Sequence, residues 1–110
     1  MQIPLSRIAH ARSGDKGDIS NVGVIAIRPQ HYPILLRELS AARVGRWFGP
    51  LVKGSVTRFE LRNLFALNFV MERALDGGGT ISLRTDAQGK THAGLLLTMP
   101  IEVSEHELDC

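Results

Sequence analysis

A polar segment near the N-terminus holds most of the residues that could do chemistry. Residues 10–21 read HARSGDKGDISN. Gly14 and Gly17 allow the backbone to turn sharply and to present N–H groups to an anion, and Arg12 and Lys16 add positive charge. The G-x-x-x-x-G-K-[ST] spacing of a phosphate-binding P-loop is absent. The segment is therefore a candidate anion-binding loop of another kind.

The remaining polar residues of this segment leave its role open. Ser13 and Asn21 add neutral hydrogen-bonding groups, whereas Asp15 and Asp18 oppose simple anion binding. The two carboxylates could instead orient the cations or accept a proton. The segment is therefore either a ligand-binding loop or the structural turn of a β-hairpin.

A row of charged residues is the second candidate. Arg58, Glu60 and Arg62 alternate along a predicted strand, so they share one face. This face is either solvated or lines a cleft in which the arginine forks bind a carboxylate or phosphate. We expect the row and residues 12–21 to converge on one polar cleft. Asn68 is either satisfied in the core or points into the same cleft.

The elements that must position these residues begin with strands. Residues 5–11 lead into the turn, and residues 22–27 form a short apolar run rich in β-branched side chains, which is typical of a buried strand. Residues 56–62 form the clearest strand. Because side chains alternate across a strand, Phe59 and Leu61 are predicted to face the core and the charged row to face away from it.

Two helices are predicted around this strand. Residues 33–48 carry apolar side chains at helical spacing and have a proline in the first turn. Residues 64–75 follow Asn63, a favourable N-cap, and precede Gly77, a favourable stop. This second helix would be apolar nearly all round, so either the core or a partner protein should cover it on more than one side.

The last part of the chain is less regular. Residues 80–84 predict another strand, and residues 90–99 fit either a helix or a returning strand. We favour the helix, ended before Pro100. The order of these elements predicts a sheet with helices packed on one face, an α+β fold.

Composition and length indicate one globular domain over residues 1–110. The chain is 44% hydrophobic and 22% charged, and a chain of this length can bury one core without disulfides. With Cys110 as the only cysteine and the four histidines far apart, we expect no disulfide, no metal site and no cofactor. Without a signal-peptide core or a run approaching ~18 apolar residues, a cytoplasmic protein with no membrane contact is expected.

The charge is unevenly distributed. All 13 lysines and arginines lie within residues 1–100, whereas residues 104–110 form an acidic tail. A basic body can favour an anionic small molecule or nucleic acid, or can simply be a solvated surface. Nucleic-acid binding is disfavoured because no aromatic platform or RNP-like strand is present.

Three ordered motifs resemble the small C-terminal domain of AtuA-type acyclic terpene utilisation proteins. Its opening signature is similar to residues 8–17 (IAHARSGDKG) together with residues 20–24 (SNVGV). Its second signature is similar to residues 58–61, 63–64 and 66–69. Residues 82–84 with 86–90 are similar to its third signature. The resemblance covers about residues 5–103.

This resemblance implies a ferredoxin-like two-layer sandwich, with a roughly four-stranded sheet and two or three helices on one face. In that family the domain usually follows a much larger one, and here it stands alone, so we expect a separately encoded large AtuA-like subunit, a homo-oligomer, or both. Arg62 stands where the family pattern favours proline. Together with the loop and the charged row, the matched motifs give these ligand-binding candidates: Arg12, Ser13, Gly14, Asp15, Lys16, Gly17, Asn21, Arg58, Glu60, Asn63 and Asn68.

Three functions remain open. The first is an accessory or ligand-binding subunit that works with a larger AtuA-like partner in catabolism of acyclic terpenoid or branched acyl-CoA compounds. The second is a small enzyme acting on an acyl-CoA or branched carboxylate, with Asp15 or Glu60 as base and Arg12 or Lys16 holding the anion. The third is a nucleic-acid-binding module. An anionic small molecule is the expected ligand of the first two.

Overall fold

The computed structural model describes residues 1–16, 19–49, 52, 54–72 and 92–109, with the backbone alone at Asp15, Lys16 and Asp109. Within these residues the fold is α+β, and one antiparallel sheet carries most of the chain's polar candidates. The predicted strand at residues 80–84 lies outside the described residues.

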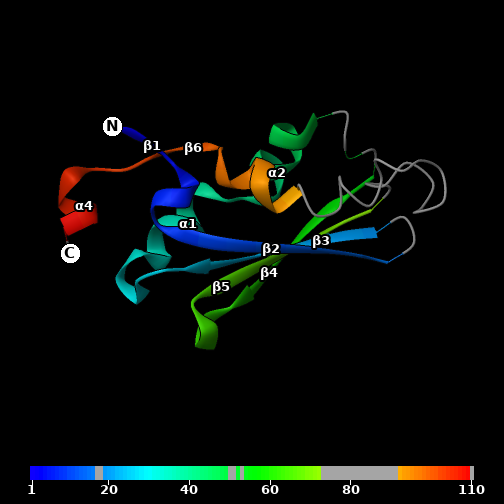
Figure 1. The fold of residues 1–110 in the computed structure, drawn as a ribbon, viewed down its shortest axis with the longest axis horizontal. Coiled ribbons are helices and arrows are strands. Elements are labelled where there is room, and N and C mark those ends of the chain that lie inside the picture. The colour runs from blue at the N-terminus through cyan, green and yellow to red at the C-terminus, as the bar shows by residue number, and fades with distance from the viewer. Residues whose placement is uncertain (17–18, 50–51, 53, 73–91, 110) are drawn as a thin grey trace.

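The main sheet has four strands in the order β2-β3-β5-β4. Strand β2 (Ala9–Lys16) pairs with β3 (Ile19–Ala26), and β4 (Val56–Leu61) pairs with β5 (Ala66–Met71). The second strand of each hairpin lies in the middle of the sheet, where β3 and β5 pair antiparallel to each other. Figure 1 shows the two hairpins crossing the molecule as one twisted sheet. The predicted hairpin is confirmed, but residues 12–16, which were expected to lie in its turn, belong to strand β2.

The predicted helix over residues 33–48 is two helices, α1 (Tyr32–Glu38) and α2 (Ala41–Phe48). The break follows from a local cap: the side chain of Ser40 accepts a hydrogen bond from the backbone N–H of Arg43 at 3.1 Å and starts α2 anew. Near the C-terminus, residues 92–97 are helical, as the pattern over residues 90–99 predicted.

The predicted helix over residues 64–75 is wrong. A short 3-10 turn (Arg62–Leu64) is followed by Phe65 in the left-handed region, with φ 53° and ψ 45°, and by strand β5. This tight connection folds β5 back onto β4. As an inner strand with one face in the core, β5 is apolar at most positions, and a short apolar run of this kind fits helix and strand alike.

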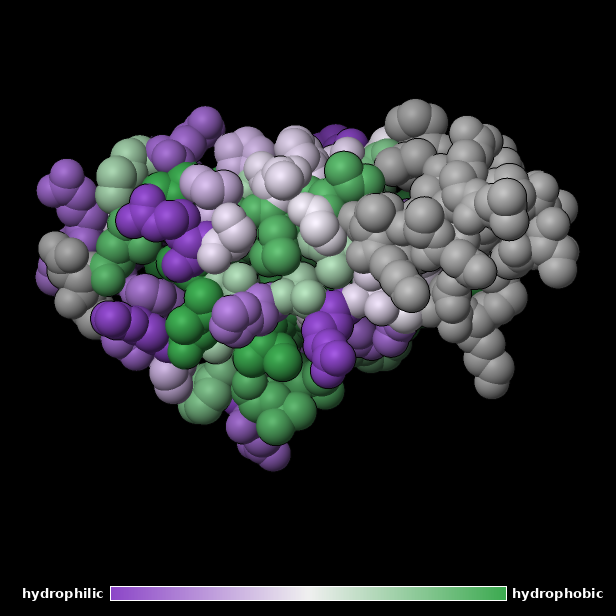
Figure 2. All heavy atoms as spheres, in the orientation of Figure 1, coloured by the Kyte–Doolittle hydropathy of each residue, from purple (hydrophilic) through white to green (hydrophobic). Residues whose placement is uncertain are grey.

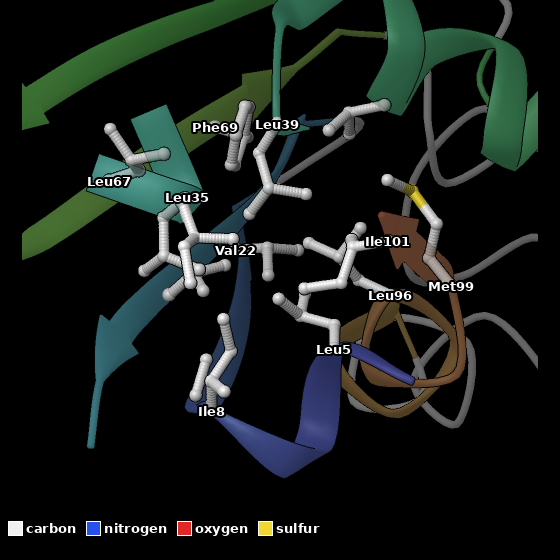
Figure 3. Packing of buried hydrophobic residues seen from close by; sticks show 14 of the residues in the cluster. Leu5, Ile8, Val22, Leu35, Leu39, Leu67, Phe69, Leu96, Met99 and Ile101 are labelled. Carbon is white, nitrogen blue, oxygen red and sulfur yellow. The ribbon is translucent and has the colours of Figure 1, made fainter. Parts of the chain in front are cut away.

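The core lies between one face of the sheet and the helices. Figure 3 shows side chains from both layers pointing toward one another. Each large apolar side chain buried in this way contributes roughly 1.5–3 kcal/mol to folding. The central members include Val22, Val24, Leu35, Leu39, Leu67, Phe69 and Leu96.

The opposite face of the sheet is open, and here the predicted orientation of β4 is reversed. Phe59 and Leu61 are 49% and 42% exposed on this face, whereas Arg58 points to the helix layer. Figure 2 shows hydrophobic side chains gathered at the tip of the β4–β5 hairpin. The reversal has a physical reason, because Arg58 binds carbonyl groups at the end of α1.

The two ends of the chain meet in a second, two-stranded sheet. Strands β1 (Gln2–Pro4) and β6 (Pro100–Glu102) pair antiparallel, with Ile3 opposite Ile101. The acidic tail forms the short helix α4 (Glu105–Asp109) at the same end of the molecule (Figure 1). None of the helices among the described residues is long and apolar enough to cross a membrane.

Candidate ligand-binding site on the open sheet face

A hollow of about 430 Å³ lies on the open face of the sheet, over β2, β3 and β5. Strand register places Arg12, Gly23 and Asn68 side by side in one row across these strands. Gly14 and Asn21 form the next row. The hollow is lined by His10, Ala11, Arg12, Ser13, Gly14, Asn21, Gly23, Ile25 and Asn68.

Two glycines within strands leave the space for this hollow. A Cβ atom built at Gly23 would lie 3.9 Å from both the carbonyl oxygen of Arg12 and the Oδ1 of Asn68, which is ordinary contact. At Gly14 it would lie 3.1 Å from the Oδ1 of Asn21, which is tight. Glycine inside a strand often marks a place where a ligand or another backbone approaches closely. The backbone at Gly23 could accommodate a Cβ atom, so glycine is not required there by the fold. The missing side chain at Gly23 instead leaves the hollow open.

The polar groups around the hollow are available to a ligand. Within the described part of the chain, the side chains of Arg12, Asn21 and Asn68 make no hydrogen bond or ion pair. A guanidinium matches the geometry of carboxylates and phosphates, and amide groups can donate to the same oxygens. Ile25, 44% exposed, supplies an apolar wall. The arrangement fits a ligand with an anionic end and an apolar body.

The other candidates of the loop are placed differently. Ser13 points to the helix layer, where its Oγ accepts a hydrogen bond from the backbone N–H of Ala93 at 3.3 Å. Asp15 and Lys16 are described by backbone only, in the part of β2 that pairs with β3. Gly17 lies outside the described residues. The predictions for the side chains of Asp15 and Lys16 therefore stay predictions.

The predicted convergence of Arg12 with the charged row is wrong. Arg12 lies on the open face, whereas the Nη1 of Arg58 donates to the carbonyl oxygens of Leu36 and Leu39, at 2.9 and 3.1 Å, on the helix-covered face. These carbonyls end α1 and would otherwise lack partners. Of the predicted pairs, the structure brings together Arg12 and Asn68, and it assigns Arg58 to the helix end.

Glu60 forms ion pairs with both of its neighbours in the charged row. Its carboxylate accepts hydrogen bonds from Arg58 and Arg62, each with a closest approach of 2.8 Å. The hydrogen bond from Arg62, with that from Arg58 and the positive charge of both, holds the pKa of Glu60 below its usual range. Asn63 is exposed in the turn that follows β4, beside Leu61 and Leu64. These residues organise the sheet edge, away from the hollow.

Sequence reasoning did not select His10, Gly23 and Ile25, which all line the hollow. The signal was present for two of them. Strand alternation from Arg12 places His10 on the same face, and a glycine between two valines in a buried strand marks a close approach. Ile25 carried no such signal, because an isoleucine in an apolar run is expected to face the core.

Beneath this region, Ser20 and His92 form a buried pair. Ser20 Oγ lies 2.8 Å from His92 Nδ1, and His92 Nε2 has no hydrogen-bond partner in the described part of the chain. Burial lowers the pKa of His92, and its ring packs edge-on against Phe48 at a centroid distance of 5.3 Å. Neither side chain is exposed, so the pair fastens the β2–β3 hairpin to the helix over residues 92–97.

The described residues contain no group of three or more His, Cys, Asp or Glu side chains placed to hold a metal ion. Comparison with known proteins finds no match among curated proteins and none among solved structures. The family model described as the AtuA ferredoxin-like domain matches residues 3–102, which is nearly the whole chain. The protein therefore belongs to the AtuA ferredoxin-like domain family.

Proposed function

We propose that this domain is a ligand-binding accessory subunit that works with a larger AtuA-like partner in catabolism of acyclic terpenoid or branched acyl-CoA compounds. Membership of the AtuA ferredoxin-like family supports the metabolic setting. The single observation that carries ligand binding is the glycine-floored hollow on the open sheet face, where Arg12 and Asn68 have no protein partner within the described residues.

The hollow suggests how such a ligand binds. An anionic carboxylate or phosphate group lies against Arg12, with amide donors from Asn21 and Asn68. The apolar, branched part of the ligand extends over Ile25 toward the exposed apolar residues of β4. Glu60 lies on the other side of the sheet, paired with two arginines, so it does not act as a base beside Arg12. The place of Glu60 favours binding over catalysis by this residue, and Asp15 as a base stays a prediction.

The apolar residues of the open face support a partner role. Phe59 and Leu61 on β4 and Leu64 in the following turn are 49%, 42% and 63% exposed. Leu61 shares a row of the sheet with Ile25, and Ala66 lies between them. Side chains of this size, gathered on one face, are costly to leave in water and commonly mark an interaction surface. In this proposal the larger subunit covers the hairpin tip and closes the hollow over its ligand.

Ligand binding is tested by isothermal titration calorimetry of the protein with a branched acyclic acid and, separately, with its CoA thioester. Arg12→Ala should weaken binding about tenfold or more, because a charge-assisted hydrogen bond is lost. Gly23→Val should fold normally and abolish binding, since its side chain fills the hollow. Arg46→Ala, an exposed arginine on α2, is the matched control. Equal affinity in all four proteins, or no binding to the wild type, overturns the proposed ligand site.

The partner role is tested separately with a purified larger AtuA-like protein from the same genome. Phe59→Ser should abolish co-elution in size-exclusion chromatography with light scattering, which also reports self-association. Leu95→Ser is the matched control, since Leu95 is 39% exposed in the helix over residues 92–97 rather than on the open sheet face. No co-elution of the wild type, or equal co-elution of both variants, contradicts docking through the open face.

A further inference from the structure

A second cavity lies at the end of the molecule where the two chain ends meet, apart from the open sheet face. Its volume is about 450 Å³, and it is bounded by the first 3-10 turn, the turn after β3, and α4. Its lining is predominantly polar, and Ile8 and Leu108 contribute apolar side chains. None of its lining residues belongs to the hollow described above.

Two arginines line this cavity without a protein partner. Arg7 comes from the 3-10 turn Leu5–Arg7. Arg28 lies two residues after the end of β3 and directly precedes the turn Pro29–His31. Within the described residues, neither guanidinium has a hydrogen bond or an ion pair. Two like charges beside one cavity repel each other unless an anion lies between them. Arginine pairs of this kind fit the oxygens of phosphate or sulfate.

His31, in the same wall, provides an independent observation. It is 6% exposed, and its Nε2 lies 3.3 Å from the carbonyl oxygen of Leu108. A carbonyl oxygen can only accept, so Nε2 carries the hydrogen of this bond. The other ring nitrogen, Nδ1, is buried and has no hydrogen-bond partner among the residues that the structure describes. A buried polar atom without a partner is costly, and this one belongs to a residue that lines the cavity.

We infer that this cavity binds a phosphoryl group, held by Arg7 and Arg28 and supported by His31. The ligand class is inorganic phosphate or a phosphate monoester, which share the same tetrahedral oxyanion. The bound negative charge offsets the repulsion between the arginines, and a P–OH group of the ligand can donate a hydrogen bond to His31 Nδ1. The inference is independent of the ligand proposed for the open sheet face.

The other charged groups at the cavity affect how tightly it can bind an anion. Glu105 lines it from α4 and opposes an anion, while the amine of Met1 is occupied by Glu102 Oε1 and the carbonyl oxygen of Val103, at 3.2 and 2.9 Å. The carboxylate of Glu105 therefore weakens affinity for a free oxyanion. It also gives a variant with the opposite sign, because Glu105→Gln removes this repulsion and keeps the side chain's shape.

The test is an NMR titration of the isotope-labelled protein with sulfate, whose charge stays constant near neutral pH, then with phosphate and with AMP. Shifts should appear at the amides of residues 7, 8, 28 and 105–108 and at the ring of His31. Tighter binding of AMP than of phosphate identifies a monoester as the ligand. Equal binding of the two identifies the free oxyanion.

Variants decide whether the arginines hold the anion. Arg7→Ala and Arg28→Ala should each weaken sulfate binding about tenfold, since each removes a charge-assisted contact. Glu105→Gln should strengthen it, and Arg46→Ala should leave it unchanged. Both arginine side chains are exposed, so their loss leaves the core intact, which thermal melting verifies. Shifts confined to other regions, or unaltered affinity in both arginine variants, overturn the inference.

Discussion

Two polar regions of this domain differ in how completely their charges are paired. In the first, the carboxylate of Glu38 accepts hydrogen bonds from Arg37, from Arg43 and from the backbone N–H of Glu102, at 3.1, 2.7 and 2.8 Å. In the second, on the open sheet face, Arg12 and its neighbouring amide side chains have no protein partner within the described residues.

The difference separates architecture from function. The Glu38 group joins α1, α2 and β6, and Arg37 extends it to Glu107 on α4. Burial raises the pKa of Glu38, but the hydrogen bonds from Glu102, Arg43 and Arg37 outweigh burial and lower it overall. A fully paired group of this kind holds elements together. Polar groups left unpaired beside a hollow are instead free to bind something else.

The largest expected effect comes from breaking the paired region. Glu38→Gln should lower the free energy of unfolding by about 2 kcal/mol, because the carboxylate of Glu38, 11% exposed, loses its charge-assisted hydrogen bonds to two arginines that are themselves 47% and 34% exposed. Glu102→Gln, at an exposed ion pair, should change it by less than about 1 kcal/mol. Urea denaturation of both variants measures this contrast. Equal effects would contradict a structural role specific to Glu38.

A comparison of two arginines sharpens the same contrast. Arg58→Ala should destabilise the protein by about 1–2 kcal/mol, since the carbonyls of Leu36 and Leu39 lose their donor. Arg12→Ala should change stability by no more than about 0.5 kcal/mol, because no described group depends on it. Paired thermal melts check the difference. Substantial destabilisation by Arg12→Ala would show that Arg12 stabilises the β2–β3 hairpin rather than binding a ligand.

Acidification should weaken the domain through His92, a smaller effect. Its pKa in the folded state is lowered by burial, so the unfolded chain takes up the proton first. Stability is then fully present above the unfolded pKa of about 6.5 and falls as pH drops through it toward the folded pKa. Urea midpoints measured in steps between about pH 7.5 and about pH 5 follow this loss.

His92→Gln should flatten the curve in that range. A further loss at lower pH remains in the variant, because the hydrogen bond from Arg37 lowers the pKa of Glu107 to about 2 and carboxylates of this kind lose their contribution only below about pH 4.5. An unchanged slope between about pH 7.5 and about pH 5 in His92→Gln would assign the loss to another group.

The smallest expected effect has the opposite sign. Gly23→Ala should stabilise the protein by about 0.5 kcal/mol, because glycine in a strand costs conformational entropy and a Cβ at this position meets only ordinary contacts. Differential scanning calorimetry resolves such a change. A loss of stability would show that Gly23 serves the backbone of β3 rather than the hollow.

Local patterns predicted much of the fold. The apolar run at residues 22–27 and the turn residues before it predicted the β2–β3 hairpin, because both signals are short-range. The α+β class and the helix within residues 90–99 followed in the same way. The hairpin also brought Arg12 and Asn21 together, so part of the candidate site was accessible from the sequence.

The errors arise where distant residues decide. Residues 66–71 are apolar at most positions because β5 is an inner strand, and the sequence could not show which neighbours would pair with it. The orientation of β4 depends on Arg58 reaching the end of α1, about twenty positions away in the sequence. Because the orientation of β4 is the reverse of the predicted one, Arg58 and Arg12 lie on opposite faces of the sheet. They therefore do not share the single cleft that was predicted.

The pairing of β1 with β6 has a consequence for the order of folding. Ile3 and Leu5 complete the core only by packing with Met99 and Ile101, almost a whole chain length away. Contacts this distant in sequence are slow to form, because a long loop must close first. During synthesis, Ile3 and Leu5 stay without these neighbours until residues 99–101 have left the ribosome. Until then, these apolar side chains leave the nascent domain open to aggregation.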